Sequence, residues 1–174
     1  MDYLSSINEG LFFKIFNLSG QNKILDLFMV TGANYVIFGI FFLCLAAFFF
    51  GSIKDKKAFL LTILSLFLGF ILLKTIGTLI FEPRPFQTFS ITPLVTLAPN
   101  DSFPSDHTLI ASIIAFSYIF YKSKYGVPMG FASIWVGFGR VYSGVHYPFD
   151  ILGGIIMGFL AVCLAWIIKK KISF

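Results

Sequence analysis

The chain contains two histidines, and one of them lies in a short polar stretch between two apolar runs. This stretch places Arg140, His146 and Asp150 within eleven residues. An apolar surrounding penalises every charge that is not paired, so the clustering indicates a site rather than a solvated loop. A histidine beside a carboxylate can serve as a nucleophile or as an acid or base.

His146 and Asp150 are four residues apart, which is the spacing at which two side chains meet on a helix. Pro148 is typical of a first helical turn, so we expect a helix to begin near Tyr147. The carboxylate then reaches one ring nitrogen of His146 and leaves the other nitrogen facing the site. A histidine held in that tautomer is a competent nucleophile. The structural alternative is a helix-cap histidine that bonds Asp150 and does no chemistry.

Two further polar islands lie earlier in the chain, at 82–86 and 103–108. In the second island Ser105 follows a proline, which is typical of a helix N-cap. A helix that starts there puts free backbone N–H groups and the positive end of its dipole beside His107, where an anion is favoured. His107 is then available to protonate a leaving oxygen.

Two arginines accompany these histidines, Arg84 in the first island and Arg140 shortly before His146. The planar guanidinium fork matches the oxygens of a phosphate group. Two arginines, two histidines, a serine and a carboxylate in these islands therefore indicate an oxyanion site. The competing interpretation is that both arginines anchor the chain at lipid headgroups.

The composition places these motifs in a membrane. The 174 residues are 57% hydrophobic and 12% charged, whereas soluble domains carry about 25% charged residues. Because a membrane helix needs about 20 apolar residues, we expect an all-α integral membrane protein, with one domain over residues 1–174 and about five transmembrane helices. The expected spans are about 25–50, 57–81, 105–121, 127–142 and 148–168.

Two segments outside these spans also have an expected structure. Within the first twenty residues, apolar side chains recur at a roughly helical spacing between charged ones, which predicts an interfacial amphipathic helix. The connection at 82–104 is rich in proline, threonine and phenylalanine and is too long for an idle turn, so we expect a functional loop or lid.

Three lysine clusters determine the expected orientation. They follow the first, third and fifth expected spans, at 54–57, 122–124 and 169–171. With five spans they share one face, which the positive-inside rule assigns to the cytoplasm. All candidate site residues then fall on the outer face of the cell membrane. Topology thus explains the net charge of +5, and no nucleic-acid partner is expected.

The three islands together carry a family resemblance. The order Arg84-Pro85, Pro104-Ser105-x-His107 and Arg140-x5-His146-x3-Asp150 resembles the type 2 phosphatidic acid phosphatase (PAP2) superfamily of membrane lipid phosphatases. The match covers about residues 74–150. Within that superfamily, segments 81–86 and 103–108 most resemble the bacitracin-resistance type of undecaprenyl-diphosphatase.

The resemblance implies a role for each motif residue. His146 attacks phosphorus and forms a phosphohistidine, Asp150 orients it, and His107 acts as a general acid and later activates water. The phosphoryl oxygens are bound by the remaining motif residues, Arg84, Ser105 and Arg140, and by backbone N–H groups near Asp106. The implied reaction requires no metal and no cofactor.

Three positions depart from the superfamily pattern. A lysine is usual seven residues before the Arg-Pro pair, but that position is Gly77, so Lys74 one turn earlier is the candidate substitute. Asp106 replaces a usual glycine beside an anionic substrate, so it must point away, pair with an arginine or bind a cation. We count Lys74 and Asp106 among the candidate phosphate-binding residues. Gly139 replaces a usual serine, which removes one hydroxyl donor.

We therefore expect a lipid phosphatase that removes the terminal phosphate of a polyprenyl diphosphate such as undecaprenyl diphosphate. Phosphatases for phosphatidylglycerophosphate, phosphatidate or lipid A are the alternatives within the enzyme class, because the motifs contact only the phosphoryl group. A non-enzymatic binder or transporter of lipid phosphates is the alternative outside it. The oligomeric state and any lid motion of 82–104 stay open.

Overall fold

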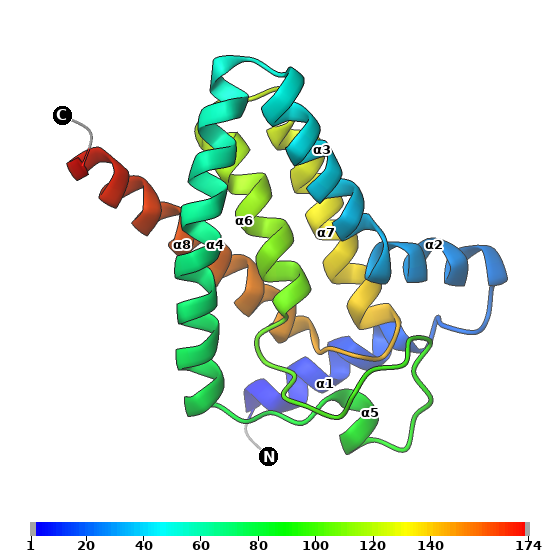
Figure 1. Ribbon diagram of the computed structural model, residues 1–174. Coiled ribbons are helices and arrows are strands. Elements are labelled where there is room, and N and C mark those ends of the chain that lie inside the picture. Colours follow the sequence, from blue (N-terminus) through cyan, green and yellow to red (C-terminus); the bar gives the residue numbers. More distant parts are fainter. Residues whose placement is uncertain (1–2, 173–174) are drawn as a thin grey trace.

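The computed structural model describes residues 3–172, which fold into eight helices, one of them central (Figure 1). Extended pairing in this part of the chain is limited to an isolated bridge between Pro83 and Asp101. The expectation of an all-α protein is therefore confirmed. The helices are α1 (Tyr3–Phe16), α2 (Lys23–Asn34), α3 (Val36–Phe50), α4 (Ile53–Leu79), α5 (Pro85–Thr88), α6 (Asp106–Phe120), α7 (Gly126–Tyr142) and α8 (Pro148–Ile172).

Two helices of the described chain, α4 and α8, are by themselves long and apolar enough to cross a membrane. The expected span at 25–50 is not one helix: α2 and α3 meet at Tyr35 with a bend of 50°. The bend arises because α2 packs across α7, whereas α3 turns away and runs beside α4 (Figure 1). With the bent pair counted as one span the number is three, so five spans remain a prediction.

Glycines bring α2 close to α7. A Cβ on Gly139 of α7 would lie 2.5 Å from the carbonyl oxygen of Met29 and 2.6 Å from the backbone nitrogen of Ala33. A Cβ on Gly32 of α2 would lie 2.5 Å from the ring of Trp135. The usual serine at position 139 would therefore collide with α2, so packing explains this departure from the family pattern.

Helix α6 is the central helix and packs against α4, α7 and α8. Its face toward α8 meets glycines, because a Cβ on Gly154 would lie 2.7 Å from the carbonyl oxygen of Ser105 and one on Gly158 would lie 3.0 Å from Cβ of Ser112. These two glycines let α8 lie directly on the start of α6. The first turn of α8 and the first turn of α6 are thereby neighbours.

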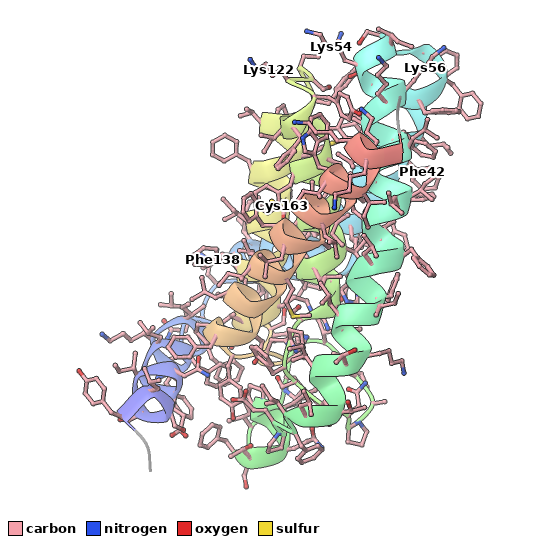
Figure 2. All side chains as sticks on the ribbon, turned by 90° about the vertical axis from the view of Figure 1, so that its left-hand side faces the viewer. Phe42, Lys54, Lys56, Lys122, Phe138 and Cys163 are labelled. Carbon is pink, nitrogen blue, oxygen red and sulfur yellow. The ribbon has the colours of Figure 1, made fainter. Side chains whose placement is uncertain are left out.

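One end of the bundle gathers the lysines. The turn between α3 and α4 is closed by Asp55, which accepts hydrogen bonds from Ser52 and, across to the turn between α6 and α7, from Ser123. Figure 2 shows Lys54, Lys56 and Lys122 together at this end. The α5 segment and the long loop lie at the opposite end (Figure 1). The sequence-based separation of lysines from polar islands is thus present in the fold.

Helix α1 lies across the end of the bundle that carries the long loop (Figure 1). Its buried Phe12 packs against Phe89 and Tyr147, with ring centroids 6.4 and 5.5 Å away. Asn8 accepts a hydrogen bond of 3.0 Å from the backbone N–H of Phe149. The predicted N-terminal helix is confirmed as a helix, and it supports the first turn of α8 from outside.

Candidate active site

The connection between α7 and α8 presents His146 at the end of the bundle. Gly144 adopts a left-handed backbone with φ of 79°, and Pro148 opens α8 as predicted. The backbone N–H of Val145 bonds the carbonyl of Arg140, which closes the turn. His146 is fully buried in this turn. Its ring orientation is therefore determined by the groups packed around it.

The predicted contact between His146 and Asp150 is present, with 3.3 Å between Nδ1 and Oδ2. The same carboxylate oxygen accepts a hydrogen bond of 2.7 Å from the backbone N–H of Tyr147 and one of 2.5 Å from the hydroxyl of Ser102. That hydroxyl also lies 3.4 Å from Nδ1 of His146. Three groups from two distant segments, the Asp150 carboxylate, the Tyr147 N–H and the Ser102 hydroxyl, thus lie together on one side of the imidazole.

Arg84 occupies the other side of the imidazole. Its Nη1 lies 2.9 Å from Nε2 of His146 and donates to the carbonyl oxygen of Val145 at the same distance. Its Nε donates to Oδ1 of Asn100 at 2.8 Å. The guanidinium is thereby fixed beside the ring nitrogen that does not face Asp150.

The start of α6 confirms the predicted N-cap. Ser105 is fully buried, and its Oγ accepts from the N–H of Thr108 at 3.5 Å and from the Thr108 hydroxyl at 3.1 Å. Its own backbone N–H bonds the carbonyl oxygen of Asp150 at 3.1 Å. This bond ties the helix start at His107 to the first turn of α8.

Asp106 has a partner that the sequence analysis did not consider. Its Oδ1 lies 3.0 Å from Nδ1 of His107 and accepts from the backbone N–H of the same residue at 2.8 Å. The carboxylate therefore pairs with the neighbouring histidine rather than with an arginine. A carboxylate on one ring nitrogen leaves the other nitrogen for proton transfer.

A pocket of about 300 Å³ opens beside Arg84. Lys74 and Gly77 of α4 line it, together with Asp106 and with Asn100 and Asp101 of the long loop. Lys74, the Gly77 that replaces the usual lysine, and Arg84 therefore line the same cavity. Among the described residues nothing lies within 4 Å of a Cβ built on Gly77.

Arg140 is almost fully buried, and within residues 3–172 its Nε has no hydrogen-bond partner. An unpaired guanidinium nitrogen in the interior is costly, and a headgroup anchor on the surface would not be buried. Its position in the last turn of α7, three residues before Ser143, puts it beside the His146 turn. These features favour a role inside the site over the anchoring alternative.

The environment acts strongly on the imidazole. Burial lowers the pKa of His146 to about 4, against the upward pull of Asp150 and together with the charges of Arg140 and Arg84. At neutral pH the ring is therefore uncharged and its Nε2 carries a lone pair. Burial also lowers the pKa of Arg84, opposed by nearby carboxylates, chiefly Asp106; arginine still remains a donor at all relevant pH.

Sequence reasoning missed two residues of this site, Ser102 and Asn100. Both lie directly before the 103–108 island, in the polar run Asn100-Asp101-Ser102. Such a run in an otherwise apolar chain is a signal, but its partners Arg84 and Asp150 are 16 and 48 residues away. No periodicity relates these positions, so only the fold reveals the contacts.

Known proteins resemble this chain in sequence. A model of the PAP2 superfamily matches residues 56–173. The undecaprenyl-diphosphatase BcrC of Bacillus subtilis is 35% identical over 158 residues, which cover 88% of this chain and 82% of the relative.

Solved structures resemble the fold. LpxE of Aquifex aeolicus superposes with a TM-score of 0.74 at 26% identity, covering 92% of this chain and 94% of the other. A transmembrane PAP2 type phosphatidylglycerolphosphate phosphatase from Bacillus subtilis superposes with a TM-score of 0.65 at 24% identity, covering 99% and 89%. The second likeness is one of fold alone.

Proposed function

We propose, from the premise that this chain belongs to the PAP2 superfamily, that it is a membrane phosphatase acting on a polyprenyl diphosphate such as undecaprenyl diphosphate. The observation that carries the phosphatase chemistry is the placement of His146 between Asp150 on Nδ1 and Arg84 on Nε2. The relative named undecaprenyl-diphosphatase, similar over most of both chains, supports the substrate.

The reaction begins with attack of the His146 Nε2 lone pair on the terminal phosphorus. A nitrogen–phosphorus bond forms as the phosphorus–oxygen bond to the lipid monophosphate breaks. Arg84 and Arg140 bind the phosphoryl oxygens, whose charge is spread over them in the transition state. His107 begins protonated beside Asp106 and donates this proton to the leaving oxygen of the lipid monophosphate, which leaves His107 neutral.

The second half of the reaction regenerates the histidine. His107, now neutral, takes a proton from water, and the water oxygen attacks the phosphohistidine. The nitrogen–phosphorus bond breaks, inorganic phosphate leaves, and the electron pair returns to Nε2 of His146. Asp150 supports both halves, because it stabilises the positive charge that the imidazole acquires when Nε2 is phosphorylated. This scheme needs no metal.

The pocket beside Arg84 suits a diphosphate. Lys74 lies on α4 at the pocket wall, so its ammonium group can bind the phosphate that stays on the lipid while Arg84 binds the one that is transferred. The Ser105 hydroxyl and the free backbone N–H groups at the start of α6 supply further donors to the phosphoryl oxygens. The positive-inside rule supports an orientation in which the lysine end of the bundle faces the cytoplasm, and in that orientation the pocket opens at the outer face of the cell membrane.

The function is tested by phosphate release from a panel of lipids in detergent, with and without EDTA. The panel contains undecaprenyl diphosphate, phosphatidylglycerophosphate, phosphatidate and lipid A. We expect the fastest turnover with undecaprenyl diphosphate, no loss with EDTA, and a loss of at least about 10³-fold in His146→Ala, which lacks the nucleophile.

Each alternative predicts a different result of the same assay. Equal turnover of the glycerolipid phosphates would contradict the polyprenyl assignment. Loss of activity with EDTA would contradict the metal-free scheme. No phosphate release from any lipid, with binding retained, would instead identify a non-enzymatic lipid-phosphate binder.

A further inference from the structure

Ser102 is a buried serine in the long loop, three residues before the N-cap of α6. Its backbone N–H bonds the carbonyl oxygen of Glu82 at 2.7 Å, where the two sides of the loop meet. Its hydroxyl lies 2.5 Å from Oδ2 of Asp150 and 3.4 Å from Nδ1 of His146. Ser102 is not among the motif residues named in the sequence analysis.

The donors and acceptors around the Ser102 hydroxyl determine which hydrogen bonds it can make. An ionised carboxylate only accepts, so the single proton of Ser102 goes to Asp150. The lone pairs of the same oxygen then face the N–H on Nδ1 of His146. Because Arg84 can only donate to Nε2, that N–H must lie on Nδ1. The hydroxyl is thus compatible with one tautomer of the imidazole.

The carboxylate of Asp150 has few other supports. Oδ2 accepts from Ser102 and from the backbone N–H of Tyr147 in addition to its contact with His146. Oδ1 is buried and has no partner among residues 3–172. Removal of the hydroxyl leaves the carboxylate with one backbone donor, which does not by itself prevent rotation of the group.

We propose that Ser102 is a positioning residue that holds the Asp150 carboxylate with Oδ2 against Nδ1 of His146, and so keeps the Nε2 lone pair directed at the phosphorus. This inference rests on the proposed function, since it assigns Ser102 to the phosphohistidine step. Ser102 does not line the pocket beside Arg84, and in this role it acts through Asp150.

The chain offers a matched control in Ser143. This serine is also fully buried and lies three residues before His146, but its hydroxyl has no hydrogen-bond partner in the described part of the chain. Ser102→Ala and Ser143→Ala remove the same atom from the same end of the bundle. They differ in whether that atom contacts Asp150.

The experiment measures kcat, KM and the rate of phosphohistidine formation for both variants on undecaprenyl diphosphate, with thermal unfolding as the test of folding. Ser102→Ala should lower kcat by about 10- to 100-fold, as expected for a misdirected nucleophile, with KM within about twofold. Phosphohistidine formation should slow by the same factor. Ser102→Thr, which keeps the hydroxyl, should recover most of the rate, and Ser143→Ala should behave like the wild type.

The outcomes separate this inference from the function beneath it. Wild-type protein that releases phosphate while Ser102→Ala and Ser143→Ala share one kcat would overturn the role of Ser102 and leave the function standing. A loss in Ser102→Ala that appears in KM alone would do the same. Wild-type protein that releases no phosphate would overturn both.

Discussion

Nη1 of Arg84 lies 2.9 Å from Nε2 of His146. A guanidinium has no acceptor, so Nε2 must offer its lone pair to this contact and the ring proton must sit on Nδ1, toward Asp150. The tautomer is therefore determined from both sides of the ring. The same arginine lies beside the lone pair that attacks phosphorus in the proposed reaction, so it is near enough to donate to the phosphate oxygens.

Arg84→Lys tests whether geometry or charge matters at this position. One ammonium group keeps the charge but cannot reach Asn100, Val145 and the phosphate together in the planar arrangement of a guanidinium. We expect kcat to fall by about 10²- to 10³-fold in a protein with an unchanged melting temperature. Asn100→Ala removes one hydrogen-bond partner of the arginine, so its kcat should lie between those of the wild type and Arg84→Lys. Retention of a tenth or more of the rate in Arg84→Lys would show that charge alone suffices.

Lys74→Ala tests the substitute lysine. Lys74 is exposed at the pocket wall, so its loss should raise KM by about two- to fivefold, the size of an exposed ion pair, and leave kcat unchanged. Gly77→Lys added to that variant should restore KM, because position 77 lines the same pocket and has open space for a side chain. Kinetics of the single and double variants check this. A KM unaffected by Lys74→Ala would make this residue a membrane anchor.

Asp106→Ala tests the pairing with His107 through the leaving group. An alkoxide leaving group needs a proton from the general acid, whereas p-nitrophenolate and a lipid monophosphate need little help. Loss of the carboxylate that orients His107 should therefore lower kcat about tenfold more on a prenyl monophosphate than on p-nitrophenyl phosphate. Equal losses on both substrates would assign Asp106 to packing or binding. His107→Ala is the reference, since it should show the same dependence more strongly.

The pKa of His146 predicts a stability that depends on pH. The pKa is about 4 in the fold and about 6.5 in an unfolded chain, so between these values the unfolded state binds the extra proton. The contribution of His146 to stability should therefore fall as pH drops from about 6.5 to 4 and change no further below that range. The melting temperature in detergent should show this loss in the wild type and lack it in His146→Gln.

Glu82 acts on stability in the opposite sense over part of that range. Burial and the charge of Asp150 raise its pKa to about 7, so the folded state binds the proton first and gains stability as pH falls from about 7 toward 4.5. The His146 comparison is therefore made in a Glu82→Gln background. If the Glu82→Gln protein and the Glu82→Gln, His146→Gln protein show the same dependence of melting temperature on pH, the low pKa of His146 is wrong.

The local signals of this chain predicted much of the site. Ser105 caps α6 and Pro148 opens α8, because capping and first-turn preferences depend on neighbours in sequence. The four-residue spacing of His146 and Asp150 likewise predicted their contact. All three are properties of single turns, which sequence describes well.

Contacts between distant segments could not be predicted in this way. The bend at Tyr35 comes from the packing of α2 across α7, and the apolar run from 25 to 50 gave no sign of it. From the sequence, Gly139 indicates only the loss of a hydroxyl donor, whereas the fold shows that the approach of Met29 leaves no space for a side chain there. Ser102 reaches Asp150 only because the long loop folds back on the bundle.

Gly154 has no group that could bind phosphate or move a proton, yet a single methyl group there would lie 2.7 Å from the carbonyl oxygen of Ser105. It would push apart the two segments that the bond from Ser105 N–H to Asp150 holds together, and these segments carry the two histidines. The tolerance of this chain to substitution is thus set by contact geometry as well as by chemistry, and a residue without reactive atoms can be as constrained as the nucleophile.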